Sequence, residues 1–235
     1  MRLNKFIAGC GVCSRREADK LIEEGRVSIN GEIAGFGALV LDGDTVLVDG
    51  KEISLQEEKI VIAYYKPVGV TCTEKDKFAQ KTVIEDLGFE KRVTYAGRLD
   101  KESEGLLLMT NDGDLINAMM RGASGHEKEY EVTVDKEVTA DFIRAMSGGI
   151  YLKELDKKTR PCKVKKTGKY SFDIVLTQGL NRQIRRMCDA LGFSVKKLKR
   201  IRVMSVRLED YNLKPGEHIV LTKEEVKKLC KDAGL

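Results

Sequence analysis

The sequence predicts an α+β fold, in which a small helix–hairpin module precedes a larger domain whose mostly antiparallel, mixed β-sheet is flanked by helices. Segments typical of strands dominate the larger part, and they do not alternate regularly with helical segments, which disfavours a parallel βαβ arrangement. The first part of the chain carries helix and hairpin signals of its own. We therefore predict two domains, residues 1–58 and residues 59–235.

The front module is predicted as a short helix followed by a hairpin. Ser14 and Glu17 have the spacing of a capping box, which marks the start of a helix. Gly25 stands where a left-handed cap would end that helix. Alternating apolar residues then precede an Asn30–Gly31 pair, a strong signal for a tight hairpin turn.

The larger domain is predicted from its apolar runs. Strand candidates are rich in Val, Ile, Leu and Tyr, whereas helix candidates have apolar residues at helical spacing. The strands are expected at residues 60–65, 92–97, 105–110, 129–134, 169–177 and 198–208, and the helices at residues 114–121, 139–149 and 179–193. A polar stretch, residues 54–59, is expected to connect this domain to the front module.

Charge is distributed unevenly along the chain. The net charge is +5, but the tract from Lys153 to Arg207 holds 17 Lys or Arg against 4 Asp or Glu, so it carries +13 and the remainder −8. Clustered cations gain affinity for a polyanion by displacing its counterions, so this tract indicates a phosphate-rich partner. Arg15 and Arg16, adjacent at the predicted helix start, are also suited to phosphates. Ordinary solvated surface charge is the alternative for both groups.

Several classes of protein are disfavoured. No stretch approaches the ~20 apolar residues of a transmembrane helix, and the opening MRLNKFIAGCG is too short and too polar for a signal peptide. We therefore expect a cytoplasmic protein with no membrane partner. Cys10 and Cys13 form a single Cys-x-x-Cys motif, but no second pair follows to complete a zinc site. We predict neither a metal nor a cofactor.

Asp100 lies in a polar loop between two apolar runs, directly after a Gly-Arg-Leu sequence. The chain has no Walker-type phosphate loop and no nucleophile elbow, and only two histidines are available for a histidine-centred triad. A positioned, ionised carboxylate remains available for covalent chemistry. The residues alone leave two readings open, a nucleophile or an ordinary turn aspartate.

Longer segments carry a resemblance to known families. Residues 2–32, RLNKFIAGCGVCSRREADKLIEEGRVSINGE, resemble the small RNA-binding module first described in a small-subunit ribosomal protein. Residues 64–70, 95–115 and 178–203 resemble, in order and spacing, three signature motifs of pseudouridine synthases. The most similar branch acts on ribosomal RNA and carries the same module in front. SGHEKEYEVTV, residues 124–134, looks most like the large-subunit synthase F type within that branch.

The resemblance implies an active site with three catalytic residues. Asp100 corresponds to the catalytic aspartate, Tyr130 to the tyrosine that stacks on the target base and helps to move a proton, and Arg185 to the basic residue that pairs with the aspartate. Leu198 corresponds to a residue lining the uracil pocket. The other predicted substrate contacts are basic: Arg98, Arg182, Arg186, Lys197, Arg15, Arg16 and Lys66. In the family, the motif that contains Lys66 supports the active-site loop. Lys196 and Lys199 are predicted as further phosphate contacts.

The implied reaction is isomerisation of a uridine, with a ribosomal RNA stem-loop as substrate, a tRNA as a lesser possibility, and no cofactor. A monomer is favoured over a dimer. Two alternatives stay open. A non-catalytic RNA-binding assembly factor would use the same module and basic tract but would not need Asp100, Tyr130 and Arg185 together. A carboxylate-based glycoside hydrolase would need a paired acid at a defined separation.

Overall fold

The computed structural model describes residues 1–55, 58–73, 80–121 and 125–235. Residues 56–57 of the predicted connection therefore lie outside the described part. By its internal contacts the chain divides into two compact units. One contains Met1–Ile60, Phe89–Val93 and Asn111–Gly113, and the other contains the remaining described residues. A domain boundary after residue 58 stays a prediction.

The first unit contains two helices and a four-stranded antiparallel sheet. Ser14 and Glu17 form the predicted capping box at the start of the second helix, and Gly25 has the left-handed conformation expected at its end. The first helix was not predicted, because no side chain caps its N-terminus. The elements are α1 (Leu3–Gly9), α2 (Arg15–Glu23), β1 (Val27–Ile29), β2 (Glu32–Ile33), β3 (Val46–Val48) and β4 (Lys51–Ile53), with strand order β2-β1-β3-β4.

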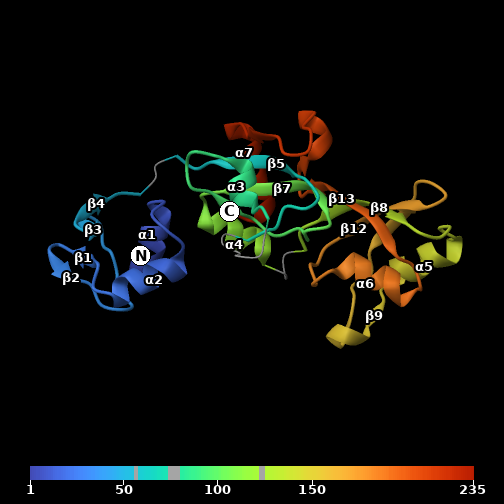
Figure 1. Cartoon of the computed structure of the whole chain (residues 1–235), viewed down its shortest axis with the longest axis horizontal. Coiled ribbons are helices and arrows are strands. Elements are labelled where there is room, and N and C mark those ends of the chain that lie inside the picture. The colour runs from blue at the N-terminus through green and yellow to red at the C-terminus, as the bar shows by residue number, and fades with distance from the viewer. Residues whose placement is uncertain (56–57, 74–79, 122–124) are drawn as a thin grey trace. The chain divides into compact units, whose positions relative to one another are not determined.

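The second unit is built on a nine-stranded sheet (Figure 1). Its strands are β5 (Val61–Lys66), β6 (Thr94–Tyr95), β7 (Glu104–Thr110), β8 (Lys128–Val134), β11 (Lys163–Lys166), β12 (Ser171–Leu176), β13 (Val195–Val203), β14 (Val206–Arg207) and β15 (His218–Val220). The main order is β11-β12-β8-β13-β7-β5-β15, with β14 beside β13 and β6 beside β7. Among these neighbours only β13 and β7 run parallel. The predicted mostly antiparallel, mixed sheet is thereby confirmed.

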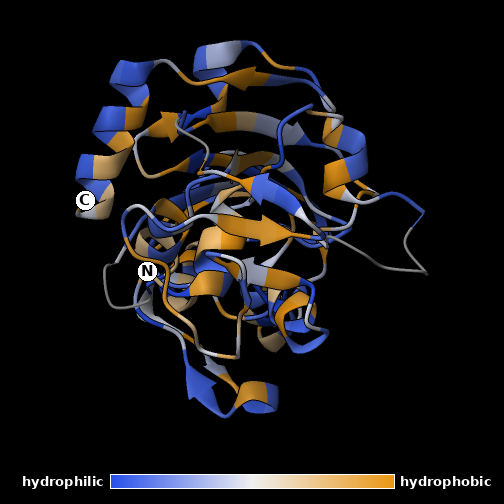
Figure 2. Cartoon of the chain, turned by 90° about the vertical axis from the view of Figure 1, so that its left-hand side faces the viewer, coloured by the Kyte–Doolittle hydropathy of each residue, from blue (hydrophilic) through white to orange (hydrophobic). Residues whose placement is uncertain are grey.

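Helices cover this sheet and complete two apolar cores. One core joins β5 and β7 to helices α4 (Gly113–Met120) and α7 (Lys223–Ala233), and the other joins β8, β12 and β13 to helices α5 (Ala140–Gly148) and α6 (Gln183–Ala190). Figure 2 shows hydrophobic residues on several of the strands and mixed colours along the helices. The remaining elements are α3 (Val83–Leu87), the hairpin of β9 (Tyr151–Leu152) and β10 (Lys157–Lys158), and the short 3-10 turns η2 (Lys153–Leu155) and η3 (Leu208–Tyr211).

The parallel contact between β7 and β13 requires a glycine. Gly105 pairs with Arg200, and a Cβ at Gly105 would lie 2.3 Å from the Arg200 carbonyl oxygen. Gly105 also has a φ of +109°, which L side chains rarely adopt. The two halves of the sheet therefore meet at a point where no side chain fits.

The three helices predicted for the larger domain are all present, as α4, α5 and α6. Across the described ranges, no helix has both the length and the apolar character needed to cross a membrane.

Candidate active site

A pocket of about 370 Å³ lies in the second unit, where the β6–β7 loop meets β8, β13 and the loop before α6. Its volume is within the usual range for a small-ligand site. Asp100, Tyr130 and Leu198, which come from three distant segments, all line it. The pocket lining also includes Arg98, Lys101, Met120, Lys128, Leu176, Arg182, Ile184 and Arg200.

The Asp100 loop, residues 96–103, is bonded to the sheet at its start and closed by a turn at its end. The amide of Ala96 donates to the carbonyl of Leu108 (2.8 Å), and Gly97 turns the chain with a φ of +95°. The amide of Ser103 then donates to the carbonyl of Asp100 (3.0 Å), which closes a turn around the aspartate. The Asp100 side chain is 31% exposed, so its carboxylate faces the pocket rather than the core.

Two buried cations hold this loop from below. Arg200 is 2% exposed; its Nε donates to the carbonyl of Leu106 (2.7 Å) and its Nη1 to the carbonyl of Arg98 (3.3 Å). The Nζ of Lys66 donates to the carbonyls of Ser103 (2.8 Å) and Pro67 (2.9 Å). The Arg200 guanidinium therefore holds the loop before Asp100, and the Lys66 ammonium holds it after Asp100.

The prediction that Lys66 contacts substrate is not supported. Lys66 is fully buried and does not line the pocket, because its side chain points under the Asp100 loop. Burial lowers the pKa of its ammonium, although the nearby Cys72 and Asp100 act in the opposite direction. The contacts fit the loop-supporting role that the resemblance implies for this motif.

Tyr130 and Leu198 are neighbours on the part of the pocket wall formed by β8 and β13. Tyr130 lies on β8 opposite Arg200 of β13, and Leu198 lies on β13 opposite Val132 of β8. Leu198 is buried and belongs to the core beneath α6, whereas Tyr130 packs against that core while facing the pocket. An aromatic face and an aliphatic wall suit a flat, flipped base.

Arg185 does not form the predicted pair with Asp100. Its Nη2 donates to the carbonyl of Glu102 (3.2 Å) and to Oγ of Ser103 (3.3 Å), and its Nη1 to the carbonyl of Val195 (3.4 Å). Arg185 also does not line the pocket. The guanidinium is engaged by the loop residues that follow the aspartate, so it contacts the loop rather than the carboxylate.

Among the described residues, Arg182 provides the charge nearest to the aspartate. Its Nη1 lies 3.9 Å from Oδ2 of Asp100 and 2.8 Å from Oε2 of Glu102. Arg182 precedes α6 in a left-handed conformation, with a φ of +51°. The Arg182 guanidinium lowers the pKa of the Glu102 carboxyl, against the opposing effect of partial burial. The predicted phosphate contact is thus already ion-paired at the pocket rim.

The other predicted RNA contacts lie on the surface. Arg98 is exposed at the pocket, and Lys197 is exposed on β13 outside it. The Nε of Arg186 donates to the carbonyl of Asn181 (3.0 Å), and its guanidinium also contacts Glu154. In the first unit, Arg15 and Arg16 are exposed at the start of α2.

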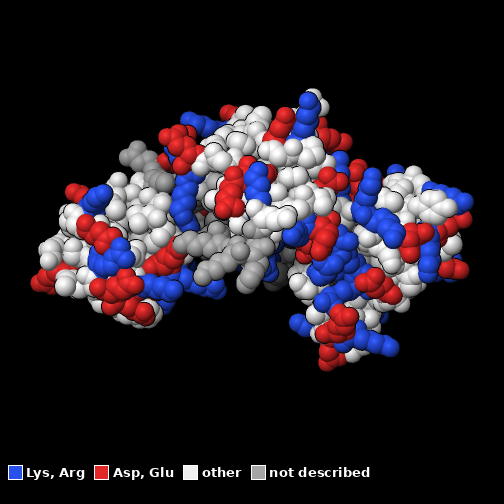
Figure 3. Space-filling view, viewed as in Figure 1, with Lys and Arg blue, Asp and Glu red and all other residues white. Residues whose placement is uncertain are grey.

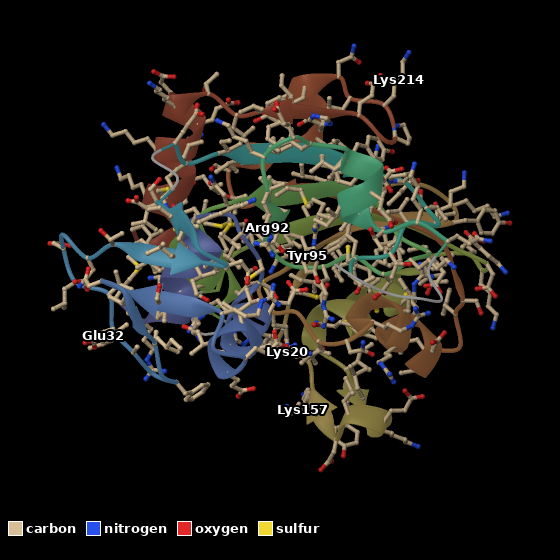
Figure 4. All side chains as sticks on the ribbon, turned by 60° about the vertical axis from the view of Figure 1, so that its left-hand side comes forward. Lys20, Glu32, Arg92, Tyr95, Lys157 and Lys214 are labelled. Carbon is tan, nitrogen blue, oxygen red and sulfur yellow. The ribbon has the colours of Figure 1, made fainter. Side chains whose placement is uncertain are left out.

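The basic tract contributes less surface charge than its count suggests. Arg200 is buried, and Arg202 is mostly buried between Glu127 and Glu129, with N–O distances of 2.9 and 2.7 Å. Lys and Arg side chains nevertheless gather over α6 and the neighbouring hairpin, interspersed with acidic ones (Figure 3). Lys157, labelled in Figure 4, lies on that hairpin, which projects beyond α6.

Sequence reasoning missed three cations of the pocket wall, Lys101, Lys128 and Arg200. Lys128 precedes Tyr130 by two residues, so strand alternation places both on the same face, and this spacing was a usable signal. Arg200 had no such signal, because the sequence of the basic tract does not distinguish a buried arginine from the exposed basic residues around it. Within the described ranges, no group of three or more His, Cys, Asp or Glu side chains is placed to hold a metal ion.

Comparison with known proteins gives concordant matches. Residues 60–190 match the RNA pseudouridylate synthase family, and residues 1–46 match the S4 domain. Dual-specificity RNA pseudouridine synthase RluF of Escherichia coli (strain K12) is 48% identical, over 98% of this chain and 79% of that protein. Ribosomal large subunit pseudouridine synthase B of Bacillus subtilis (strain 168) is 36% identical, over 97% of this chain and 95% of that protein. A crystal structure of a pseudouridylate synthase is similar, with a TM-score of 0.71 and 30% identity, over 97% of this chain and 99% of that chain.

Proposed function

This chain belongs to the RNA pseudouridylate synthase family, and we propose that it isomerises a uridine of ribosomal RNA in the pocket that holds Asp100, Tyr130 and Leu198. The observation that supports this best is the convergence of these three residues, from segments far apart in the chain, on one small pocket. A protein that only bound RNA would not require this arrangement.

The reaction breaks the bond between ribose C1′ and uracil N1, turns the base, and joins C1′ to C5. Asp100 acts as the anionic group, either by attack on the base or by participation at the sugar, and both routes need an ionised carboxylate in contact with the nucleotide. Arg182 supplies a positive charge 3.9 Å from the Asp100 carboxylate. Arg185 is proposed to act by holding the Asp100 loop through Glu102 and Ser103.

Tyr130 offers an aromatic face for stacking and a phenol for proton transfer. Leu198, beside it on the same face of the sheet, offers an aliphatic surface for the base. Because the target nucleotide must leave its stack to reach Asp100, these walls replace the stacking contacts that it loses. Arg98, Arg186 and Lys197 are proposed to meet phosphates around the pocket.

The RNA substrate is proposed to be a stem-loop of large-subunit ribosomal RNA, with a tRNA as a second possible substrate. The names of the relatives support a large-subunit ribosomal RNA substrate and a second kind of RNA substrate, since one is a large-subunit synthase and the other is described as dual-specificity. Residues 1–58 are proposed as an RNA-binding domain and residues 59–235 as the catalytic domain, acting as a cytoplasmic monomer. Arg15 and Arg16 of the front domain would meet the RNA backbone.

The test uses ribosomal RNA and tRNA transcripts labelled with tritium at uracil C5. Isomerisation releases that hydrogen to water, so release reports the reaction directly. We expect release by the parent chain and none by Asp100→Asn, with RNA binding nearly intact in the variant. Release at the parent's rate by Asp100→Asn would refute the assignment of the aspartate.

A further inference from the structure

Lys128 is a cation on the pocket wall to which no partner is assigned. It lies on β8 two residues before Tyr130, so both side chains leave the same face of the strand, and both line the pocket with Met120 and Leu198. Within the described part of the chain, its ammonium makes no hydrogen bond and no ion pair. The effects on its pKa are burial and the charge of Arg200, and both lower it.

The acids beside Lys128 in sequence are engaged elsewhere. Glu129, on the other face of β8, and Glu127, just before that strand, both bind Arg202, at 2.7 and 2.9 Å. The neighbouring Arg200 adds charge without an acid partner, since its donors go to two backbone carbonyls and its buried Nη2 has no partner. This wall therefore carries positive charge that the described protein does not neutralise.

An uncompensated cation within a small pocket is costly for the folded protein unless a ligand supplies the missing charge or acceptor. Arg98, Lys101 and Arg182 are exposed at the rim, where they are available to RNA phosphates. Lys128 is only partly exposed and lines the pocket with Tyr130 and Leu198, the residues proposed to contact the base. Its partner is accordingly the base rather than the backbone.

We propose that Lys128 is a further catalytic residue, which donates a hydrogen bond to a carbonyl oxygen of the target uracil and stabilises the negative charge on the ring when the C1′–N1 bond breaks. The inference rests on the function proposed above. When that bond breaks, its electron pair stays with the ring and is shared by N1 and the carbonyl oxygens. The C5–C1′ bond then forms, C5 loses a proton and N1 gains one, so no co-reactant is needed. Lys128 keeps its proton throughout.

The first experiment compares Lys128→Met and Lys128→Arg with the parent chain in single-turnover tritium release at saturating RNA. Removing a donor aimed at developing charge typically costs about 10²- to 10³-fold in rate, so we expect a loss of that size in Lys128→Met without weaker RNA binding. Lys128→Arg should recover much of the rate, because it restores a cationic donor. Lys214→Met, at an exposed lysine outside the pocket, is the control, and thermal melts check folding.

The second experiment identifies the contact itself. Transcripts carry 2-thiouridine or 4-thiouridine at the target position, since sulfur is a weaker acceptor than oxygen. If Lys128 donates to one of the two carbonyl oxygens, sulfur at that position should slow the parent chain more than it slows Lys128→Met. The variant lacks the donor, so the replacement removes no hydrogen bond from it. Equal slowing of both proteins by both replacements would overturn the contact.

The outcomes separate the two proposals. If the parent chain releases no tritium from any transcript, the proposed function fails and this inference fails with it. If the parent chain is active and Lys128→Met matches its rate, the proposed function stands and the role of Lys128 is refuted.

Discussion

The Nη1 atom of Arg182 lies 3.9 Å from Oδ2 of Asp100, and the same nitrogen lies 2.8 Å from a carboxylate oxygen of Glu102. Arg185, one helical turn later, contacts the carbonyl of Glu102 and the hydroxyl of Ser103 instead. One arginine thus supplies charge at the aspartate from an exposed position, and the other fixes the loop that carries the aspartate. Removing one arginine should therefore affect catalysis and RNA binding differently from removing the other.

We expect Arg185→Ala to lower kcat by about 10²-fold, because loss of its contacts lets the Asp100 loop shift and small misplacements have effects of that size. Arg182→Ala should lower kcat less and should weaken RNA binding more, since Arg182 is exposed at the pocket rim. Single-turnover rates and RNA affinities of both variants measure this, with Lys214→Ala as the control. A larger kcat loss in Arg182→Ala would reverse the two assignments.

Gly105→Ala is expected to destabilise the protein by about 3 kcal/mol or more, which is a severe effect for a single substitution. The added Cβ would lie 2.3 Å from the Arg200 carbonyl oxygen and 2.7 Å from its amide nitrogen, and backbone in a parallel strand pair cannot yield cheaply. Urea denaturation measures the change. Gly113→Ala is the matched control, because a Cβ added there would meet no described atom within 4 Å and the φ of Gly113 is not positive; an equal loss there would contradict the argument.

The sequence was informative where one local signal decides a structure. Ser14 and Glu17 predicted the start of α2, because a capping box needs only the residues that form it. Helix α7 begins with the same signal, formed by Thr222 and Glu225. The pairing of β7 with β13 has no such local signal, because it depends on where Gly105 meets a strand almost a hundred residues later in the chain.

Some of the residues that the sequence predicts for the site line the pocket, and others do not. Resemblance selected Asp100, Tyr130 and Leu198, and the structure places all three on one pocket. It could not distinguish a lysine in the pocket from one beneath the loop, so Lys66 was assigned to the substrate although it is buried. The choice between Arg182 and Arg185 as partner of Asp100 depends on the left-handed backbone at Arg182, for which the sequence gives no local reason.

Tyr64→Phe should lower the free energy of unfolding at pH 7 by about 1.5–3 kcal/mol, the usual range for a hydrogen bond to a charged group. The fully buried Tyr64 donates to Asp86, which also pairs with Lys81 at 2.6 Å. Burial alone would raise the pKa of Asp86, but the bonds from Lys81 and Tyr64 outweigh it and the pKa is lowered. Urea denaturation measures the loss, with the exposed Tyr170→Phe as control.

The effect of Tyr64→Phe should depend on pH in a defined direction. Because the pKa of Asp86 is lower in the folded state, its stabilisation is complete above the ordinary aspartate pKa and is lost as pH falls through the folded value. Without Tyr64 the folded pKa rises, so the variant has less of this stabilisation to lose. The difference between parent and variant should shrink as the pH is lowered below the ordinary aspartate pKa, and a difference that grows there would contradict the role of Asp86.

The double substitution of Arg15 and Arg16 by Ala should weaken RNA binding and reduce its salt dependence. Both side chains are exposed at the start of α2, and each phosphate contact contributes about 0.7–0.9 to the slope of log affinity against log salt. Loss of two contacts should therefore lower that slope by about 1–2 units. The matched control replaces Lys227 and Lys228, an exposed adjacent pair on α7. If both double variants change the slope equally, the effect reflects net charge alone and the front domain does not meet the RNA through these arginines.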